Sequence, residues 1–284
     1  MPPRWWAGSV GAVPPQPLSP KQPGLPRKLL YWATLLAACS IGETCADLVS
    51  HEFGLGYVRA SALFVAAFLA LVAFERHMRV PEAARYWIAI ALMSTTGTAL
   101  ADLFTRTLGL GYAGTSVLLL TLFCGMLLAR SRFRPAASSG SHDPGDPLST
   151  DVPLQLEHAT LPPTDAGYWA AIMVASTLGT SLGDFVSDGL GVGFGAGTLL
   201  LGTILAGLLG AECFVRGADT ALYWAALVAT STIGATSGDW LTKEHGLGLA
   251  FPVVIAAQVA LFAALAVLVG RLARTRETTL AAGR

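Results

Sequence analysis

The sequence predicts an all-α polytopic membrane protein with eight transmembrane helices arranged as four tandem helical hairpins. Hydrophobic residues make up 53% of the 284 residues and charged residues only 13%, against roughly a quarter charged in an average soluble domain. Eight apolar stretches have about 20 residues each, the length that crosses a hydrocarbon core of about 30 Å as a helix. We expect the spans at 29–50, 57–75, 86–106, 112–130, 168–188, 194–215, 223–243 and 249–271.

Composition divides the chain into two membrane halves and three polar segments. Residues 1–28 hold eight of the sixteen prolines and predict a disordered cytoplasmic tail. Residues 135–166, rich in Pro, Ser, Asp and Gly, predict a flexible cytoplasmic linker. This linker separates membrane half 29–134, with repeats 1 and 2, from membrane half 167–272, with repeats 3 and 4. Residues 273–284 are expected to form a second cytoplasmic tail.

The distribution of Lys and Arg predicts the orientation in the membrane. Eighteen Lys and Arg balance eighteen Asp and Glu, so no overall basic field exists to hold nucleic acid. Fifteen of these cations lie on one side of the predicted spans, whereas the other side has Arg59, Arg106 and Lys243. Because Lys and Arg near helix ends favour the cytoplasmic side, both termini are predicted to be cytoplasmic. We expect a multi-pass protein of a bacterial inner (plasma) membrane, with the lipid bilayer as its first partner.

A fourfold internal repeat fixes how the predicted helices correspond to one another. Tyr-Trp pairs begin at Tyr31, Tyr86, Tyr168 and Tyr223, at intervals of 55, 82 and 55 residues. Eleven residues after each tyrosine is a glycine: Gly42, Gly97, Gly179 and Gly234. Sixteen residues after it is an aspartate: Asp47, Asp102, Asp184 and Asp239. Gly-Leu-Gly or Gly-Val-Gly begins 23 residues after it in every copy. These invariant offsets predict that each repeat is one two-helix hairpin.

The repeat resembles a known family of bacterial membrane proteins. Tandem two-helix units that open on Tyr-Trp and continue through Ser/Thr-x-Gly, Asp and Gly-Leu/Val-Gly are similar to a repeat of unknown function. That repeat defines the family, and its members are often labelled only as membrane-anchored proteins. The similarity covers about residues 31–272. It implies the eight-helix repeat architecture and carries no activity with it.

The repeated aromatic and glycine residues have structural interpretations. Tyr-Trp is expected at the lipid boundary, where aromatic side chains with one polar end are favoured. The central glycines, each followed four residues later by Ala or Gly, predict close helix packing. Gly-X-Gly predicts a tight turn with positive φ, and backbone carbonyls lining a pore are its less favoured alternative. Hydroxyls before each central glycine are expected either to bond the preceding helical turn or to line a polar path.

The repeated aspartates differ in the residue that follows one helical turn later. Asp102 is followed by Arg106, and Asp239 by Lys243, which predicts two structural or gating ion pairs. Repeats 1 and 3 have His51 and Asp188 at this position instead. The two halves of the chain therefore each contain one acidic and one internally paired hairpin, which predicts pseudo-twofold halves.

The unpaired acids predict an ion site. Glu43, Asp47 and His51 form one stripe at four-residue spacing, and Asp184 and Asp188 form another. Glu43 is the deepest acid, about 18 Å above Tyr31 along a continuous helix, and such intramembrane carboxylates commonly mark an ion path. Glu43, Asp47 and Asp184 are the expected metal ligands. For the aspartates, the alternative is a turn-capping role; for His51, it is a solvated side chain.

These residues predict a membrane transporter or channel for a cation. Carboxylate, hydroxyl and carbonyl oxygens favour a divalent metal of the Mn or Mg type, which could be exchanged for protons. The alternative is a non-transporting membrane scaffold or sensor whose aspartates are structural turn caps. An enzyme is not expected, because the sequence has no Ser-His-Asp arrangement, two-His metal motif or nucleotide loop. No cofactor other than the transported cation is expected, and a homo-oligomer is compatible with the sequence.

Overall fold

The computed structural model describes residues 25–74, 82–132, 166–211 and 219–282, and all regular structure in these ranges is helical. The long helices are α1 (Leu25–Asp47), α2 (Gly56–Phe74), α3 (Glu82–Asp102), α4 (Gly111–Arg132), α6 (Ala166–Asp184), α7 (Phe194–Ala211), α8 (Asp219–Thr242) and α9 (Phe251–Ala282). Short π-helices extend three of them: η1 (Leu48–Glu52), η3 (Leu103–Thr107) and η4 (Phe185–Gly189). Most of the expected N-terminal tail and nearly all of the expected linker lie outside the described residues.

An all-helical polytopic membrane protein is confirmed. Seven of the described helical segments are long and apolar enough to cross a membrane. The eighth long helix, α8, is not among these seven and is rich in hydroxyl residues and glycine between Thr230 and Gly238. It occupies the same place in its repeat as α1, α3 and α6. Helix α9 continues to Ala282 and so includes most of the segment expected as a C-terminal tail.

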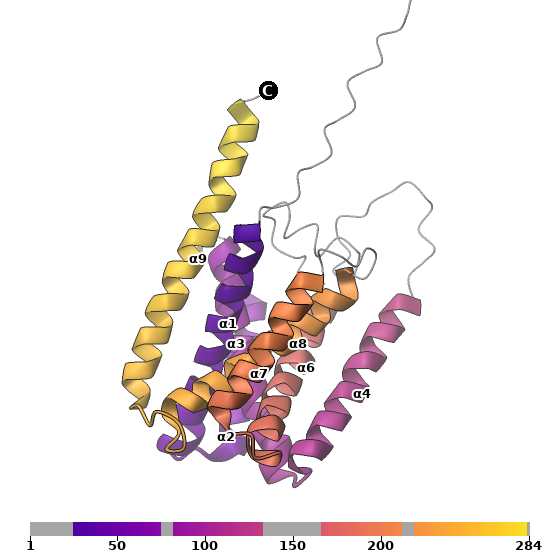
Figure 1. Ribbon diagram of the computed structural model, residues 1–284, viewed down its shortest axis with the longest axis vertical. Coiled ribbons are helices and arrows are strands. Elements are labelled where there is room, and N and C mark those ends of the chain that lie inside the picture. Colours follow the sequence, from indigo (N-terminus) through magenta and orange to yellow (C-terminus); the bar gives the residue numbers. More distant parts are fainter. Residues whose placement is uncertain (1–24, 75–81, 133–165, 212–218, 283–284) are drawn as a thin grey trace, which may run out of the picture.

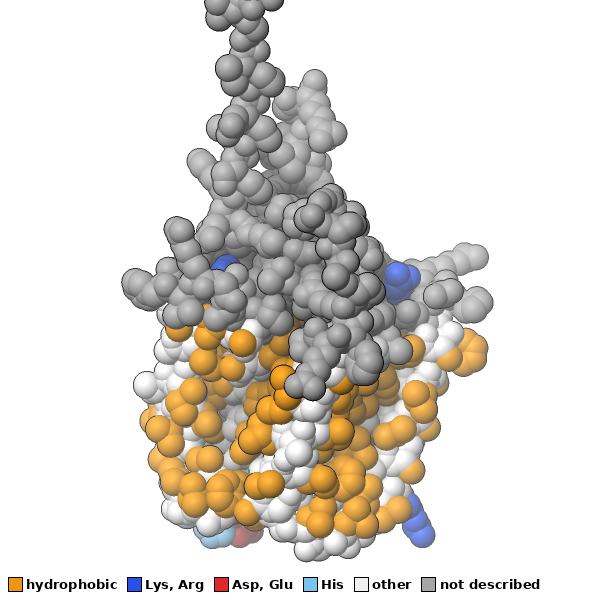
Figure 2. Space-filling model, turned by 90° about the vertical axis from the view of Figure 1, so that its right-hand side faces the viewer, with side chains coloured by type: hydrophobic (Ala, Val, Ile, Leu, Met, Phe, Trp, Pro, Cys, Tyr) orange, Lys and Arg blue, Asp and Glu red, His pale blue; other side chains and the backbone are white. Residues whose placement is uncertain are grey.

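The first helices of the four repeats form a closed inner ring. Helix α1 packs against α3, α3 against α6, α6 against α8, and α8 against α1. We call these four the inner helices, and α2, α4, α7 and α9 the outer helices. About 70% of each of the apolar windows of α1, α3 and α6 is buried, against 11–22% for the outer helices. Figure 2 shows hydrophobic side chains over the body of the molecule and charged ones towards its ends, as expected of a lipid-facing surface.

Each outer helix packs against the inner helix of the following repeat. Helix α2 contacts α3, α4 contacts α6, α7 contacts α8, and α9 returns to α1 (Figure 1). Equivalent hydroxyls mark these contacts: Ser61 Oγ donates to the Ala99 carbonyl at 2.8 Å, and Thr198 donates to Thr236 at 2.9 Å. In the last contact, Thr44 instead donates to Gln258 Oε1 at 2.6 Å. The ring is thus cyclic, and the expected twofold relation is part of it, since repeats 1 and 3 lie across the ring from each other.

The central glycines bring neighbouring inner helices into close contact, as the sequence predicted. A Cβ atom at Gly97 would lie 3.0 Å from the backbone nitrogen of Thr177 and would also meet the Ser176 side chain. The same relation joins Gly42 to Ser94, Gly179 to Ser231 and Gly234 to Cys39. An added Cβ would lie 2.7–3.0 Å from a backbone atom of the neighbouring helix at all four positions, so any side chain there would force the helices apart.

The Gly-X-Gly turns are confirmed, with one exception. Seven of the eight glycines have positive φ values, between 59° and 82°. Gly246 does not, and it lies against the backbone of Trp240. In the fourth repeat α8 ends at Thr242 and the chain turns directly, whereas a π-helix precedes the turn in the other three.

We expect Gly97→Ala to lower the free energy of unfolding by about 1–3 kcal/mol, because its methyl group overfills the contact between α3 and α6. The measurement is denaturation of the purified protein in mixed micelles. Gly202→Ala on outer helix α7 is the matched control, since a Cβ there meets nothing within 4 Å, and helix propensity predicts a gain of up to about 1 kcal/mol. Equal stability of the two variants would contradict the close packing of the inner ring.

Candidate cation site

Side chains at four-residue spacing on the inner helices face the axis of the ring and form layers along it. In repeat 1 these are Tyr31, Leu35, Cys39, Glu43 and Asp47, which are all buried. Residues four apart on a helix lie on one face, so each repeat contributes one side chain to each layer. We call the end of the bundle at Tyr31 the tyrosine end and the opposite end, with Asp47, the aspartate end.

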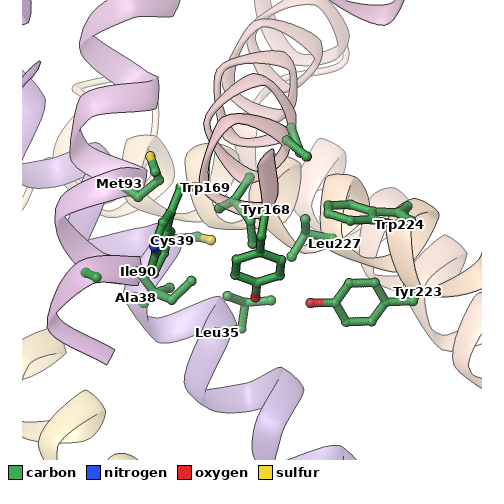
Figure 3. Close-up of a cluster of buried hydrophobic side chains, with 14 of the residues drawn as sticks. Leu35, Ala38, Cys39, Ile90, Met93, Tyr168, Trp169, Tyr223, Trp224 and Leu227 are labelled. Carbon is green, nitrogen blue, oxygen red and sulfur yellow. The ribbon is translucent and has the colours of Figure 1, made fainter. Parts of the chain in front are cut away.

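The four tyrosines of the Tyr-Trp pairs meet at the axis, so their expected position at the lipid boundary was wrong. The Tyr86 hydroxyl lies 3.1 Å from that of Tyr31 and 2.9 Å from that of Tyr168, and the Tyr31 hydroxyl lies 3.4 Å from that of Tyr223. Figure 3 shows Tyr168 and Tyr223 with their hydroxyls directed towards each other. Each hydroxyl is hydrogen-bonded by equivalent hydroxyls of neighbouring repeats, which explains why these aromatics are buried.

The tryptophans enclose this tyrosine layer in the same cyclic order as the helices. Each tyrosine ring packs against the tryptophan of the following repeat, at centroid distances of 5.6–6.4 Å: Tyr31 with Trp87, Tyr86 with Trp169, Tyr168 with Trp224, and Tyr223 with Trp32. One turn further along each inner helix lies a buried aliphatic residue: Leu35, Ile90, Ile172 or Leu227. The axis is therefore closed by aromatic and aliphatic side chains at the tyrosine end.

The hydroxyls of the inner helices bond backbone carbonyls, which confirms the first of the two roles expected for them. Threonines such as Thr96 and Thr232 return a hydrogen bond to the carbonyl four residues earlier. Ser94 instead donates to the Cys39 carbonyl of the neighbouring helix at 3.4 Å. The axial layer above the aliphatic one is thus built from Ser94, Ser176, Ser231 and Cys39 and is polar.

Glu43 lies in the next axial layer and is 3% exposed. Thr98 donates to Glu43 Oε2 at 2.9 Å, and the Thr180 hydroxyl lies 3.4 Å from the same oxygen and 3.1 Å from Thr98. Repeat 4 has Ala235 in this layer and Gly238 one turn later. A Cβ at Gly238 would lie 2.9 Å from Glu43 Cβ, so the absent side chain leaves the space that the glutamate occupies.

The four repeated aspartates form a layer directly beyond Glu43, and each is at most 4% exposed. Both ion pairs expected from the sequence are present, with Arg106 Nε 2.8 Å from Asp102 and Lys243 Nζ 2.5 Å from Asp239. Lys243 also lies 3.9 Å from Asp47 Oδ2. Five buried carboxylates, the four aspartates and Glu43, are thus accompanied by the two cations that contact this cluster, Arg106 and Lys243, in the described part of the chain.

The structure separates the predicted site residues by depth. Asp184 is buried in the aspartate layer, whereas Asp188 is exposed and accepts a hydrogen bond from Tyr112 at 3.3 Å. His51 has a 45% exposed side chain and lies 3.8 Å from Asp47 Oδ1. His51 and Asp188 therefore form the rim of the aspartate end and not its interior.

Two groups of three side chains in the described residues are close enough to share a metal ion. Glu43, Asp47 and Asp239 offer ligand atoms within 4.8 Å of one another, and so do Asp47, His51 and Asp102. Asp47 belongs to both groups. Asp239, which the sequence assigned only to an ion pair, takes the place expected for Asp184 in the buried group. Asp239 joins this group because the ring closes and makes repeat 4 the neighbour of repeat 1.

A closed ring of four inner helices with acids on its axis, covered by four outer helices, defines a helical-repeat membrane protein. The family model described as Repeat of Unknown Function (DUF347) matches residues 30–79, 85–135, 167–218 and 222–278. The chain belongs to this family, and the four matched segments coincide with the repeats found above. Among curated proteins and solved structures, no match was found.

We expect Thr98→Val to lower the free energy of unfolding by about 1–3 kcal/mol, because a buried carboxylate loses a hydrogen-bond donor. The loss should shrink in the Glu43→Gln background, so a double-mutant cycle by micelle denaturation measures the coupling. Thr121→Val on outer helix α4 is the control, since within the described residues Thr121 is exposed and bonds the Val117 carbonyl of its own helix. A zero coupling energy would contradict the Thr98–Glu43 contact.

Proposed function

We propose that this protein is a membrane transporter for a cation. The observation that carries the proposal is the buried acidic cluster on the ring axis, in which five carboxylates outnumber two cations. Carboxylates at membrane depth are costly and are typical of ion or substrate paths. Structural turn caps would not need to converge on an axis or to include Glu43, which lies four residues deeper than the nearest repeated aspartate.

The two groups of ligand atoms support a path with two steps. Asp47, His51 and Asp102 lie at the rim, where His51 is exposed, and Glu43, Asp47 and Asp239 lie deeper. Because Asp47 is common to both, a cation could pass between them without leaving its coordination. The aliphatic and tyrosine layers close the axis beyond Glu43 in this state. This closure favours a carrier, which opens one end at a time, over a channel.

The distribution of cations supports the orientation in a bacterial inner membrane. The sequence assigns fifteen Lys and Arg to the side of the predicted spans that carries the Tyr-Trp pairs, and three to the other side. The tyrosine end and both termini are then cytoplasmic, and the acidic cluster faces the outside. A non-transporting scaffold or sensor is the second candidate, favoured by the ion pairs that partly neutralise Asp102 and Asp239.

We expect Glu43→Gln and Asp184→Asn to abolish cation flux in proteoliposomes while the protein stays folded. The neutral side chains keep the shape of the axis but remove charge that a cation needs. Flux of Mn, Mg, Zn, Ca, K and protons would be measured with ion-sensitive dyes. Glu52→Gln is the control, because Glu52 is an exposed acid on η1 at the same end and its loss should leave flux unchanged.

Unchanged flux in both axial variants would contradict the assignment of these residues to the ion path. If none of these ions moves in the unsubstituted protein, the scaffold or sensor interpretation is favoured instead.

A further inference from the structure

Lys243 differs from the equivalent residues of the other repeats in where it reaches. His51, Arg106 and Asp188 all lie in π-helices at the rim. Lys243 follows the end of α8 directly, and its side chain is the least exposed of the three cationic or imidazole groups here, at 28% against 34% for Arg106 and 45% for His51. Its ammonium contacts Asp239 and lies 3.9 Å from Asp47.

The ammonium thus lies against two of the three carboxylates that are grouped around one point. Glu43 and Asp47 come from repeat 1 and Asp239 from repeat 4, which are neighbours in the ring. Among the described residues, hydrogen bonds to Glu43 go to Oε2. Asp239 Oδ2 contacts Lys243, whereas Asp239 Oδ1 is fully buried and has no hydrogen-bond partner in the part of the chain that the structure describes.

A buried carboxylate oxygen without a donor is costly unless a cation binds it. Three carboxylates and no sulfur or imidazole are the donor set of a hard divalent cation such as Mn²⁺ or Mg²⁺. We propose that Glu43, Asp47 and Asp239 bind a divalent cation and that the Lys243 ammonium competes with it for Asp47 and Asp239. This inference rests on the proposed function, because it names the ion class of that path.

The competition gives the lysine a role in the transport cycle. Without a divalent ion, Lys243 partly neutralises the three carboxylates. The acidic cluster therefore carries a lower net charge while the empty carrier returns to its starting conformation. When the ion binds, electrostatic repulsion drives the ammonium towards the rim. The buried Phe194 ring lies 4.9 Å from Nζ and makes a cation–π contact with the ammonium before it moves.

The test measures Mn²⁺ binding to the purified full chain in detergent, with free Mn²⁺ followed by electron paramagnetic resonance. We expect Asp239→Asn to weaken binding by at least about tenfold, and the control Glu52→Gln, an exposed acid at the same end, to change it by less than about threefold. Lys243→Gln should strengthen binding by about tenfold, because it removes the competitor, whereas Lys243→Arg should restore weaker binding. Lys243→Gln leaves Asp239 unpaired and can destabilise the protein, so thermal unfolding is recorded too. Mn²⁺ should raise the unfolding midpoint of Lys243→Gln more than that of the unsubstituted protein.

Weaker or unchanged binding in Lys243→Gln would overturn the competition, and unchanged binding in Asp239→Asn, or none in the unsubstituted protein, would overturn the site. Binding with all the expected variant effects but without flux in proteoliposomes would support the site and refute the transport function. Cation flux that persists in Asp239→Asn would support transport and overturn the assignment of Asp239.

Discussion

The contact between each central glycine and the following inner helix is the constraint on which the rest of the structure depends. At Gly42, Gly97, Gly179 and Gly234 the neighbouring backbone lies so close that no side chain fits. This proximity makes the ring narrow. Because the ring is narrow, side chains on the axial faces meet their equivalents directly, whether they are phenols or carboxylates. The tyrosine layer and the acidic cluster are thus two results of one packing distance.

The scaffold is fourfold, but the chemistry on its axis is not. All four repeats keep Tyr, Gly and Asp at fixed offsets, which secures closure of the ring at both ends. The axial positions between and beyond them differ: Glu43 faces two threonines and Ala235, and Lys243 replaces a rim residue. A symmetric ring of four aspartates would attract a cation equally to all four repeats. The departures from symmetry concentrate carboxylates between repeats 1 and 4.

Much of the architecture could be predicted from the sequence because glycine spacing and hydropathy are local signals. The helices, the turns, the close packing at Gly97 and the pairs of Asp102 and Asp239 with their neighbouring cations all follow from such signals. The burial of Tyr31 and its equivalents could not be predicted, since one phenol gives no indication that the phenols of neighbouring repeats satisfy its hydroxyl. The proximity of Asp239 to Glu43 depends on ring closure between residues almost 200 positions apart, which no local pattern records.

The packing of each outer helix against the inner helix of the following repeat has a consequence for biogenesis. Helix α1 leaves the ribosome first, but the outer helix that covers it, α9, is made last. Until then the polar groups of α1 near Thr44 lack Gln258, which contacts both Thr44 and Ser40. The partly synthesised ring therefore exposes a hydroxyl-rich surface next to Glu43 to lipid. This surface is removed from the bilayer only when the fourth repeat is complete and α9 packs against α1.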